Sequence, residues 1–330
     1  MEKMAQLLKV HGSENQFFIL DQTKLENQLS DDELKQLAIK LCNPKNDILD
    51  GADGLLVVND SKFDDCLGQM RVINADGSEA KMCGNGLRTV SRYLSEKFNK
   101  DSFKVETFET NLDVKKSDDF YNNVPAFSVQ ISPISFAKDD LPFEYQGKLE
   151  MINEEVPEFL PKQTFTAVAV PNPHLISFVD EVDEDDLGEV GQALNAPNAY
   201  FPEGVNVSFC EILDENKLFV QTYERGVGFT NACGTGMSAT SLVFALLNDD
   251  YFDPDNDITV YNPGGMVKTN IQLSAHKEDS KIHLIGNATF THNLDVSESD
   301  LHSANLDNIE ISETGEEDYY QEFVNSINEA

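Results

Sequence analysis

The chain of 330 residues carries 24 Lys and Arg against 59 Asp and Glu, a net charge of −35, and 40% of its residues are hydrophobic. This length suits about two domains of ordinary size, and the composition excludes a wholly disordered or collagen-like chain. Because so acidic a protein repels phosphate backbones and anionic lipid, and no apolar run is long enough for a membrane span, we expect a cytoplasmic protein that binds neither nucleic acid nor membrane.

Alternating or short apolar runs predict strands in both halves of the chain. In the first half they cover residues 17–21, 54–59, 103–107 and 126–132. A helix is predicted over residues 30–42, because acidic residues at its start favour the positive end of the helix dipole. The second half shows the same short apolar or alternating runs, with predicted strands over residues 165–170, 175–179, 205–213, 217–223 and 266–273.

Two further helices each begin at a Cys-Gly-x-Gly segment, at Cys83 and at Cys233. Apolar residues recur at helical spacing after the first segment, and residues 237–247 after the second are small or apolar nearly all round. A helix that is apolar on every face is a buried helix. We therefore predict a duplicated domain, in which sheets wrap around one central helix per half, with a boundary near residues 131–133.

The chain has five cysteines, an odd number, and no C-x-x-C pair, so a disulfide framework is not expected. A cysteine at the start of a helix meets free N–H groups and the positive end of the dipole, which favour the thiolate. Adjacent glycines let backbone N–H groups approach an anion. Two such sites can hold one carbon between two thiols, so that one thiol removes a proton and the other returns a proton to the opposite face. Cys83 and Cys233 are the candidates, and Cys42, Cys66 and Cys210 are expected to be packing residues.

From residue 291 onward the chain is rich in Asp and Glu and has no Lys or Arg. This composition favours a solvated, disordered tail over residues 297–330, which we expect to be dispensable for chemistry. One alternative stays open, because Tyr320, Phe323, Val324 and Ile327 have the spacing of a short docking helix.

Two long segments, residues 74–86 and 223–236, resemble the signature segments of diaminopimelate epimerases. The shorter segments 11–15, 51–54, 172–174 and 205–207 share the resemblance, which runs in order from about residue 9 to about residue 295. It implies an α+β (mixed α/β) fold of two pseudo-symmetric domains, each a β-barrel-like sheet around a central helix, with the active site in the interdomain cleft. The implied domains are residues 1–132 and 133–283, a strand returning to the first domain at about 284–296, and the tail.

The resemblance implies an isomerase that converts LL-2,6-diaminopimelate to meso-diaminopimelate, for lysine and peptidoglycan synthesis, with no cofactor and no metal. Its partner is this small-molecule substrate, with a homodimer as the candidate assembly. Cys83 and Cys233 resemble the two acid–base thiols, and His174 a helper near them. The implied substrate-binding residues are Asn15, Asn74, Gly84, Asn85, Asn172, Asn206, Glu224, Arg225, Gly234 and Thr235. Among these, the backbone amides of the Gly-Asn and Gly-Thr pairs would hold the reacting carboxylate.

Structural roles are the alternatives for several of these residues. The asparagines could be turn-formers that satisfy local backbone groups. Glu224 and Arg225 could form a surface ion pair, although a diacid substrate calls for a bidentate cation. His174 could be a buried histidine with a purely structural hydrogen bond.

The chain departs from the family pattern at a few places. Phe229 stands where the family usually has Glu, and Lys81 where an acidic residue is usual. Pro171 replaces a common Gly, and Ser13-Glu14 replaces a Leu-Gly-like pair beside Asn15. The last two changes border substrate-binding asparagines, so a second interpretation is a racemase or epimerase of another amino acid on the same fold, independent of pyridoxal phosphate.

A third interpretation comes from another class of function, a thiol redox or metal-binding protein. That class predicts C-x-x-C pairs or clustered Cys and His residues. The sequence has neither pattern. Activity that resists chelators but is lost on thiol alkylation would separate the classes.

Overall fold

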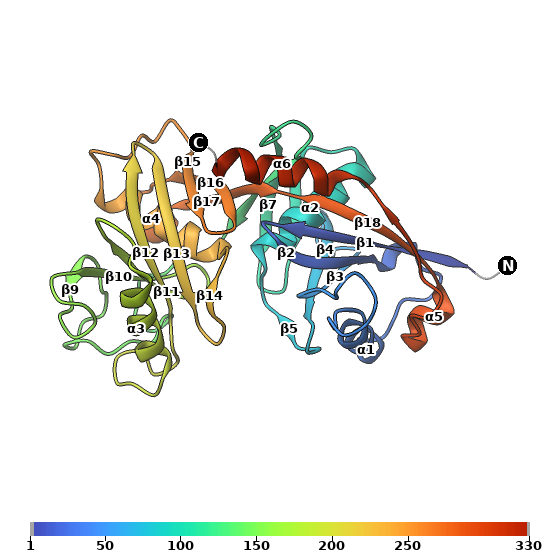
Figure 1. Ribbon diagram of the computed structural model, residues 1–330, viewed down its shortest axis with the longest axis horizontal. Helices are drawn as coiled ribbons and strands as arrows, with labels where there is room; N and C mark the ends of the chain where they lie inside the picture. Colours follow the sequence, from blue (N-terminus) through green and yellow to red (C-terminus); the bar gives the residue numbers. More distant parts are fainter. Residues whose placement is uncertain (1–2, 329–330) are drawn as a thin grey trace. The chain divides into compact units, whose positions relative to one another are not determined.

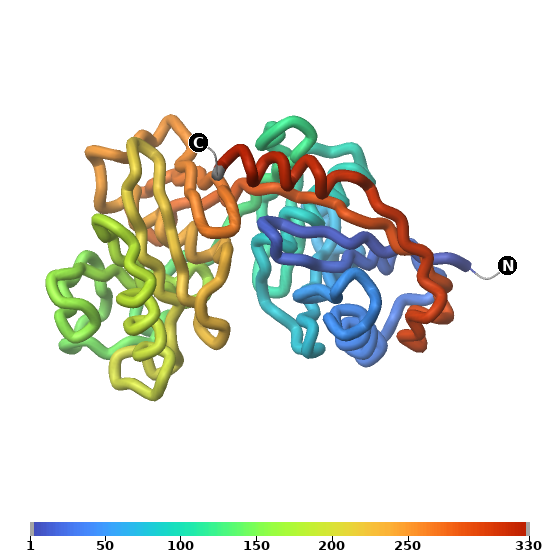
Figure 2. Tube along the Cα trace, viewed as in Figure 1, coloured from blue at the N-terminus to red at the C-terminus, as the bar shows by residue number. Residues whose placement is uncertain are grey.

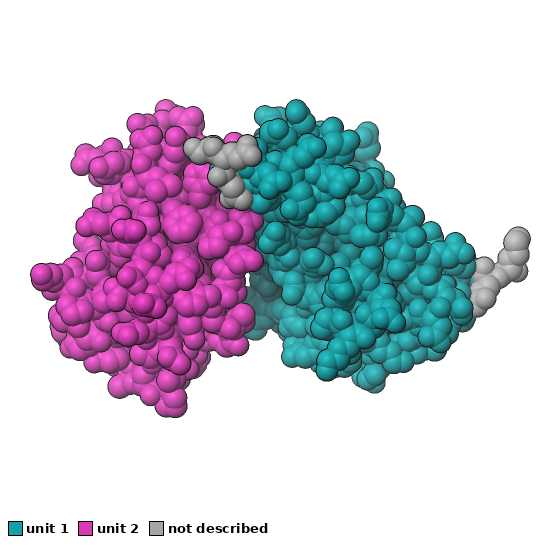
Figure 3. Space-filling view, in the orientation of Figure 1, with its two compact units in different colours: residues 1–129, 286–330 teal, residues 130–285 magenta. Residues whose placement is uncertain are grey.

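The computed structural model describes residues 3–328, and the chain divides into two compact units. Unit 1 comprises Met1–Val129 and Gly286–Ala330, and unit 2 comprises Gln130–Ile285 (Figure 3). Unit 1 is therefore built from both ends of the chain, whereas unit 2 is one continuous segment.

Unit 1 wraps strands around one central helix (Figure 1). Strand β1 pairs antiparallel with β2, β2 runs parallel to β3, β3 is antiparallel to β4, and β4 runs parallel to β6. Helix α2 packs against β1, β2, β3, β4 and β7, and every side chain in its first nine residues is buried. The elements are β1 (Met4–Gly12), β2 (Asn15–Asp21), η1 (Gln22–Lys24), α1 (Asp31–Leu41), β3 (Gly54–Asn59), β4 (Cys66–Asn74), β5 (Glu79–Ala80), α2 (Gly84–Phe98), β6 (Ser102–Glu106), β7 (Asn111–Ser117) and β8 (Ala126–Ile131), followed near the C-terminus by β18 (Thr289–Ser297), α5 (Glu298–Ser303), β19 (Glu310–Glu313) and α6 (Glu316–Asn328).

Unit 2 repeats the same succession of strand pairings. Strands β10 and β11 are antiparallel, β11 and β12 parallel, β12 and β13 antiparallel, and β13 and β15 parallel. Helix α4 packs against six of its strands and is apolar or small on every face, which explains its complete burial over residues 236–245. The elements are β9 (Glu154–Glu155), β10 (Thr164–Ala169), β11 (Pro173–Phe178), α3 (Glu184–Asn195), β12 (Asn206–Asp214), β13 (Lys217–Glu224), β14 (Gly228–Thr230), α4 (Gly234–Leu247), β15 (Ile258–Asn262), β16 (Gly265–Gln272), η2 (Lys277–Asp279) and β17 (Lys281–Asn287).

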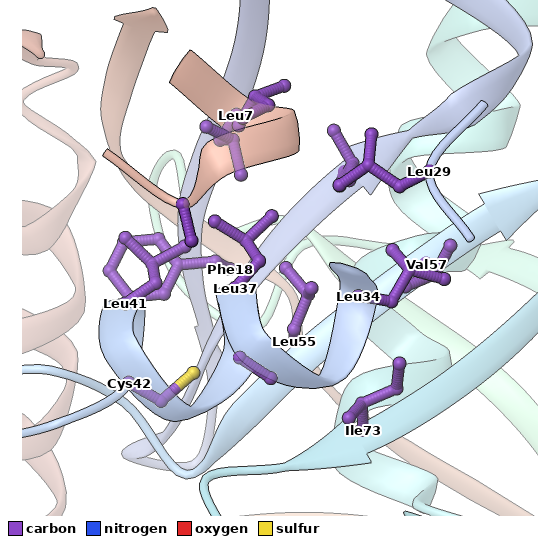
Figure 4. Packing of buried hydrophobic residues seen from close by; sticks show 14 of the residues in the cluster. Leu7, Phe18, Leu29, Leu34, Leu37, Leu41, Cys42, Leu55, Val57 and Ile73 are labelled. Carbon is purple, nitrogen blue, oxygen red and sulfur yellow. The ribbon is translucent and has the colours of Figure 1, made fainter. Parts of the chain in front are cut away.

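Helix α1 covers the outer side of the unit 1 sheet. Ser30 and Glu33 form a capping box at its start, in which each side chain bonds the backbone N–H of the other residue. Its buried face, Leu34, Leu37, Ala38 and Leu41, follows the i, i+3, i+4, i+7 spacing of an amphipathic helix. This face packs on β2 and β3 in a cluster that also encloses the Cys42 thiol (Figure 4). The packing role expected for Cys42 follows from this position.

Each strand and helix expected along the two halves of the chain is present, with ends that move by a few residues. No clear sequence pattern predicts β1, β4, β7 and β15. Helix α3 was also not predicted, since its two glycines are poor helix formers. One of them, Gly191, is required because a Cβ there would collide with the Tyr223 ring. No helix in the described residues 3–328 is both long and apolar enough to span a bilayer.

The C-terminal residues are folded, so the expectation of a solvated tail over residues 297–330 is wrong for the residues described. Strand β19 pairs antiparallel with β18, and α6 runs along β18 (Figure 2). Tyr320 and Phe323 of α6 are buried, and Val324 and Ile327 are partly buried. The apolar spacing thus outweighed the acidic composition, because Glu316 and Glu317, which share the face of the apolar stripe, are paired with Arg92 and His11.

A buried carboxylate at the end of β2 accepts hydrogen bonds from α2 and so links the strand to the helix. Asp21 accepts hydrogen bonds from Tyr93 Oη at 2.6 Å and Lys97 Nζ at 2.7 Å, and from the backbone N–H and hydroxyl of Thr23. Burial raises the pKa of Asp21, but the hydrogen bonds from Lys97, Thr23 and Tyr93 outweigh burial and leave the pKa below its ordinary value. The folded state therefore favours the ionised form of Asp21.

We predict that Asp21→Asn lowers the free energy of unfolding by about 1–3 kcal/mol at pH 7, because the bonds to Lys97 and Tyr93 lose their charge. A lowered folded-state pKa stabilises the protein fully above the unfolded pKa of about 3.9, and that contribution is lost as the pH falls through the folded value. The difference between parent and variant should therefore shrink below about pH 4. Urea denaturation at several pH values measures it, with the exposed Asp60→Asn as the control. A difference that is the same at pH 7 and pH 3 would contradict the assignment.

Candidate active site

Cys83 begins α2, and the residues around it form the Cys83 site. Cys83 is the N-cap in extended conformation, and its Sγ accepts a hydrogen bond from the Gly86 N–H at 3.3 Å. Glycine at position 86 leaves room for Leu56, since a Cβ there would lie 2.8 Å from a Leu56 methyl group and the leucine would have to shift. The first-turn amides of Gly84 and Asn85 have no partner within the helix, so they can bind an anion beside the sulfur.

Asn15 lies against this thiol and is held there by Asp53. The Asn15 Oδ1 is 3.8 Å from Cys83 Sγ and 3.3 Å from Asn85 Nδ2. The Asp53 carboxylate accepts from Asn15 Nδ2 at 2.5 Å and from the Gln16 N–H at 2.8 Å, which turns the amide oxygen toward the sulfur. Asp53 was part of a matched segment, but no role was expected for it.

Asn74 sits at the end of β4, where its backbone is paired with Gly54, the neighbour of Asp53. Its Nδ2 donates to Ser78 Oγ at 2.9 Å, and its N–H donates to the Ser78 carbonyl at 2.8 Å. The local, turn-forming role is therefore real for Asn74. Its position beside Asp53 is compatible with a second role toward a ligand.

Arg88 is the residue that sequence analysis missed entirely. Its guanidinium is fully buried and donates to Ser13 Oγ and to the Asn287 carbonyl, each at 3.1 Å. Burial lowers the pKa of Arg88 to about 10, while its attraction to Cys83 acts the other way. A lone arginine in a helical segment gives no sequence signal of this kind, because most such residues lie on the surface.

Burial raises the pKa of the Cys83 thiol, and the Gly86 N–H and the Arg88 guanidinium oppose that rise. The thiol is therefore a stronger base, once ionised, than an exposed cysteine. The nearby Asp53 carboxylate acts against Arg88 and raises the pKa of this thiol.

Cys233 begins α4 in the same way, and the residues around it form the Cys233 site. Its Sγ accepts from the Gly236 N–H at 3.4 Å and lies 3.7 Å from Thr235 Oγ1. Burial and the Glu224 carboxylate raise the pKa of this thiol well above its ordinary value, while Gly236 and Thr235 lower it. The two thiols thus share a scaffold, but Cys83 has the Arg88 guanidinium as well as the Asp53 carboxylate nearby, whereas the charged group that acts on Cys233 is the Glu224 carboxylate.

The β13–β14 hairpin carries the other candidates near Cys233. The Asn206 Oδ1 accepts from the Arg225 N–H at 2.8 Å, and Glu224 accepts from Thr230 Oγ1 at 2.6 Å. The Arg225 side chain is exposed and donates to the Glu203 carbonyl at 3.0 Å. The expected alternative, a surface pair between Glu224 and Arg225, does not describe these contacts.

His174 is fully buried on β11, opposite Asn206 in the parallel pairing with β12. Its Nε2 is 3.1 Å from Asn172 Oδ1, so with the amide oxygen facing the ring, Nε2 carries the proton. Burial, assisted by Arg225, lowers the pKa of His174 to about 3, and the ring is neutral at pH 7. A neutral ring in this place orients Asn172 and carries no charge to the thiol.

The repeated pairings place the candidates of the two units at corresponding positions. In unit 1, Asn15 lies two residues before Phe17, which pairs with Gly54 on the neighbouring parallel strand. In unit 2, Asn172 lies two residues before His174, which pairs with Asn206 in the same way. The chain has thus kept an asparagine at the start of the same strand in both units.

A model of the family described as diaminopimelate epimerase matches residues 7–129 and 166–291. The chain belongs to this family. Among its relatives, the diaminopimelate epimerase of Ligilactobacillus salivarius is 50% identical over 322 residues, which cover 97% of this chain and 98% of the relative. That of Enterococcus faecalis is 48% identical, with the same coverage. The isomerase class and the expected family are therefore confirmed.

Solved structures resemble the fold at low sequence identity. A phenazine biosynthesis protein of the PhzF family from Bacillus anthracis has a TM-score of 0.63 at 16% identity, covering 89% of this chain and 99% of its own. A methylitaconate-delta-isomerase has a TM-score of 0.61 at 13% identity, with 91% and 97% covered. A probable proline racemase from Agrobacterium radiobacter has 0.57 at 13%, with 90% and 94% covered. They confirm the mixed α/β fold class.

Two departures from the pattern of diaminopimelate epimerases have structural explanations in this chain. Phe229 stacks edge-on against Tyr223, with ring centroids 5.4 Å apart, and so covers the hairpin with apolar contact. Lys81 forms an ion pair with Glu109 at 2.7 Å. Among residues 3–328, no three His, Cys, Asp or Glu side chains are grouped to hold a metal ion.

We predict that Glu224→Gln lowers the pKa of the Cys233 thiol, because it removes the carboxylate that opposes the thiolate. Alkylation of Cys233 by iodoacetamide should then be faster at every pH between 7 and 9, since only the thiolate reacts. Peptide mass spectrometry measures the rate, with Cys83 in the same chain as the internal control. An unchanged Cys233 rate would remove Glu224 from the surroundings of this thiol.

Proposed function

We propose that the chain converts LL-2,6-diaminopimelate to meso-diaminopimelate with Cys83 and Cys233 as the two acid–base groups. The observation that supports this most is the repetition. Each unit presents a cysteine at the first turn of a buried helix, with a glycine three residues later whose N–H donates to the sulfur. Inversion of a carbon needs a proton acceptor on one face and a donor on the other. A duplicated thiol supplies both groups.

In the proposed reaction one sulfur starts as the thiolate and the other as the thiol. The thiolate removes the α-proton, and the electron pair of the C–H bond moves toward the substrate carboxylate. The thiol then gives its proton to the opposite face of the carbon, so the two sulfurs have exchanged protonation states. The amides of Gly84, Asn85, Gly234 and Thr235 would bind the carboxylate as its negative charge grows.

The raised pKa values support this role for the thiols. A carbon next to a carboxylate is a very weak acid, so a base of higher pKa loses less free energy when it accepts the proton. Burial also excludes water, which would otherwise compete for the proton. The pKa values of Cys42, Cys66 and Cys210 are raised as well, so it is the helix-start N–H contacts of Cys83 and Cys233 that set these two thiols apart.

The remaining candidates would bind the rest of the substrate. Asn15, Asn74, Asn172, Asn206 and Glu224 offer amide and carboxylate groups for the amino groups, and Arg225 offers a planar cation for the distal carboxylate. The neutral His174 would hold Asn172 in position. The lysine and peptidoglycan pathways would use the product. A cytoplasmic location and a homodimer stay predictions.

A racemase of another amino acid is the second candidate, because Pro171 and Glu14 border two of the asparagines. A substrate panel in deuterated water separates the two. Deuterium at the α-carbon of diaminopimelate alone supports the first proposal. Exchange that favours a monocarboxylic amino acid would support the second.

We predict that Cys83→Ala and Cys233→Ala each lower turnover of diaminopimelate by about 10²–10⁴-fold, since each removes one general acid–base group. Circular dichroism and thermal unfolding establish that each variant is folded. Cys66→Ala is the matched control and should keep parental turnover. A single-cysteine variant with near-parental turnover would exclude its thiol from the mechanism.

We predict that Arg225→Lys weakens binding of diaminopimelate by about 1–3 kcal/mol, because lysine keeps the charge but loses the planar fork. Calorimetric titration of the Cys83→Ala background measures binding without turnover. Lys81→Arg, at an exposed ion pair, controls for the general effect of charge. Parental affinity in Arg225→Lys would contradict the assignment to the distal carboxylate.

A further inference from the structure

The turn that presents Asn15 is strained. Ser13 and Glu14 form the two-residue loop between β1 and β2, and both have positive φ, 52° and 64°. Such a loop favours Asn-Gly, because residues with a Cβ adopt left-handed backbone at a cost in free energy. Here neither residue is glycine or asparagine. The conformation therefore depends on contacts from outside the turn.

Three side chains supply those contacts. The Ser13 N–H donates to Asn287 Oδ1 at 2.7 Å, and Arg88 donates to the Ser13 hydroxyl. The Glu14 N–H donates to His11 Nδ1 at 3.3 Å. Because Nδ1 of His11 accepts this bond, the proton of the neutral ring resides on Nε2.

The C-terminal helix α6 determines the state of His11. The His11 Nε2 is 3.0 Å from Glu317 Oε2, and the carboxylate accepts a hydrogen bond from the Nε2 N–H. This bond favours the tautomer in which Nδ1 has no proton and accepts from the Glu14 N–H. The Tyr320 ring packs edge-on against the imidazole, with centroids 4.5 Å apart. His11 is buried, and Tyr320 is 2% exposed.

Helix α6 also forms an ion pair with α2, the helix that begins at Cys83. Glu316 binds the Arg92 guanidinium through both oxygens, at 2.5 and 2.7 Å, and Arg92 lies on α2. One C-terminal segment thus contacts both the turn that holds Asn15 and the helix that begins at Cys83.

We propose that α6 is a positioning element of the Cys83 site, in which Glu317 and Tyr320 fix His11, and His11 holds the strained turn that presents Asn15 to Cys83. The match to the family model ends at residue 291, before this helix begins, although the relatives match 97% of the chain. The inference deepens the proposed function and rests on it for its kinetic consequence. It also replaces the expectation that the tail is dispensable for chemistry.

The experiment uses the full-length chain with Tyr320→Ala, and with Glu317→Gln as a second variant that keeps the shape of the helix. We expect each to lower kcat for diaminopimelate, with Tyr320→Ala losing about 10- to 100-fold, because small misplacement of a reacting group costs rate steeply. Tyr319→Ala, at an exposed position of the same helix, is the matched control and should keep parental kcat. Assays run well below the unfolding temperature of each variant separate this loss from a loss of stability.

A compensating substitution tests the route through the turn. Glu14→Gly removes the strain at the second loop position, so the turn needs less support. We expect Glu14→Gly to restore several-fold of the kcat lost in Tyr320→Ala while leaving the unfolding temperature of the double variant near that of Tyr320→Ala. No recovery of kcat would exclude the turn as the route.

Alkylation of Cys83 by iodoacetamide gives a readout that needs no substrate. A loosened turn exposes the thiol and moves the Asn15 oxygen away from it, so Cys83 should react several-fold faster in Tyr320→Ala, with Cys233 unchanged. Parental kcat and parental Cys83 reactivity in both α6 variants would overturn the proposal. If the parent fails to turn over diaminopimelate, the proposed function fails, and the Cys83 rates still decide the role of α6.

Discussion

The chemistry proposed for this chain depends on placing a sulfur both at the first turn of a helix and in the interior of a domain. A helix end is normally at the surface, because its free N–H groups need water or another partner. Here strands enclose the first nine residues of α2 and residues 236–245 of α4, and the first turn keeps its amides free for the thiol and an anion. This requires helices that tolerate burial on every side, which explains why α4 is small or apolar throughout and why α2 buries even an arginine.

Duplication provides the pair of sulfurs, and later divergence makes the pair unequal. The order of parallel and antiparallel pairings is the same in both units, so the backbone supplies each cysteine with the same glycine contact. The side chains around them differ, since Arg88 attracts a thiolate at Cys83 and Glu224 repels one at Cys233. Two identical sites would favour the same protonation state, whereas an acid–base pair works best when the two states differ.

Local sequence predicted the parts of the molecule that depend on periodicity and short motifs. The cysteines at helix starts, the buried helices and most strands carry such signals. Asp53 and Arg88 could not be assigned in this way, because their roles come from contacts with residues distant in the chain, Asn15 and Asn287. The prediction of a disordered tail was wrong for a related reason. Its composition describes an isolated segment, and its folding depends on Arg92 and His11, which lie more than two hundred residues earlier.

Because β1 pairs with β18, the first strand of the chain has its neighbour near the end. During synthesis from the N-terminus, unit 2 is complete as soon as residue 285 has emerged, whereas unit 1 must wait for the last segment. A chain that lacks the last segment would have β1 paired with β2 on one edge only. The other edge, which β18 covers in the folded protein, would then be open to aggregation.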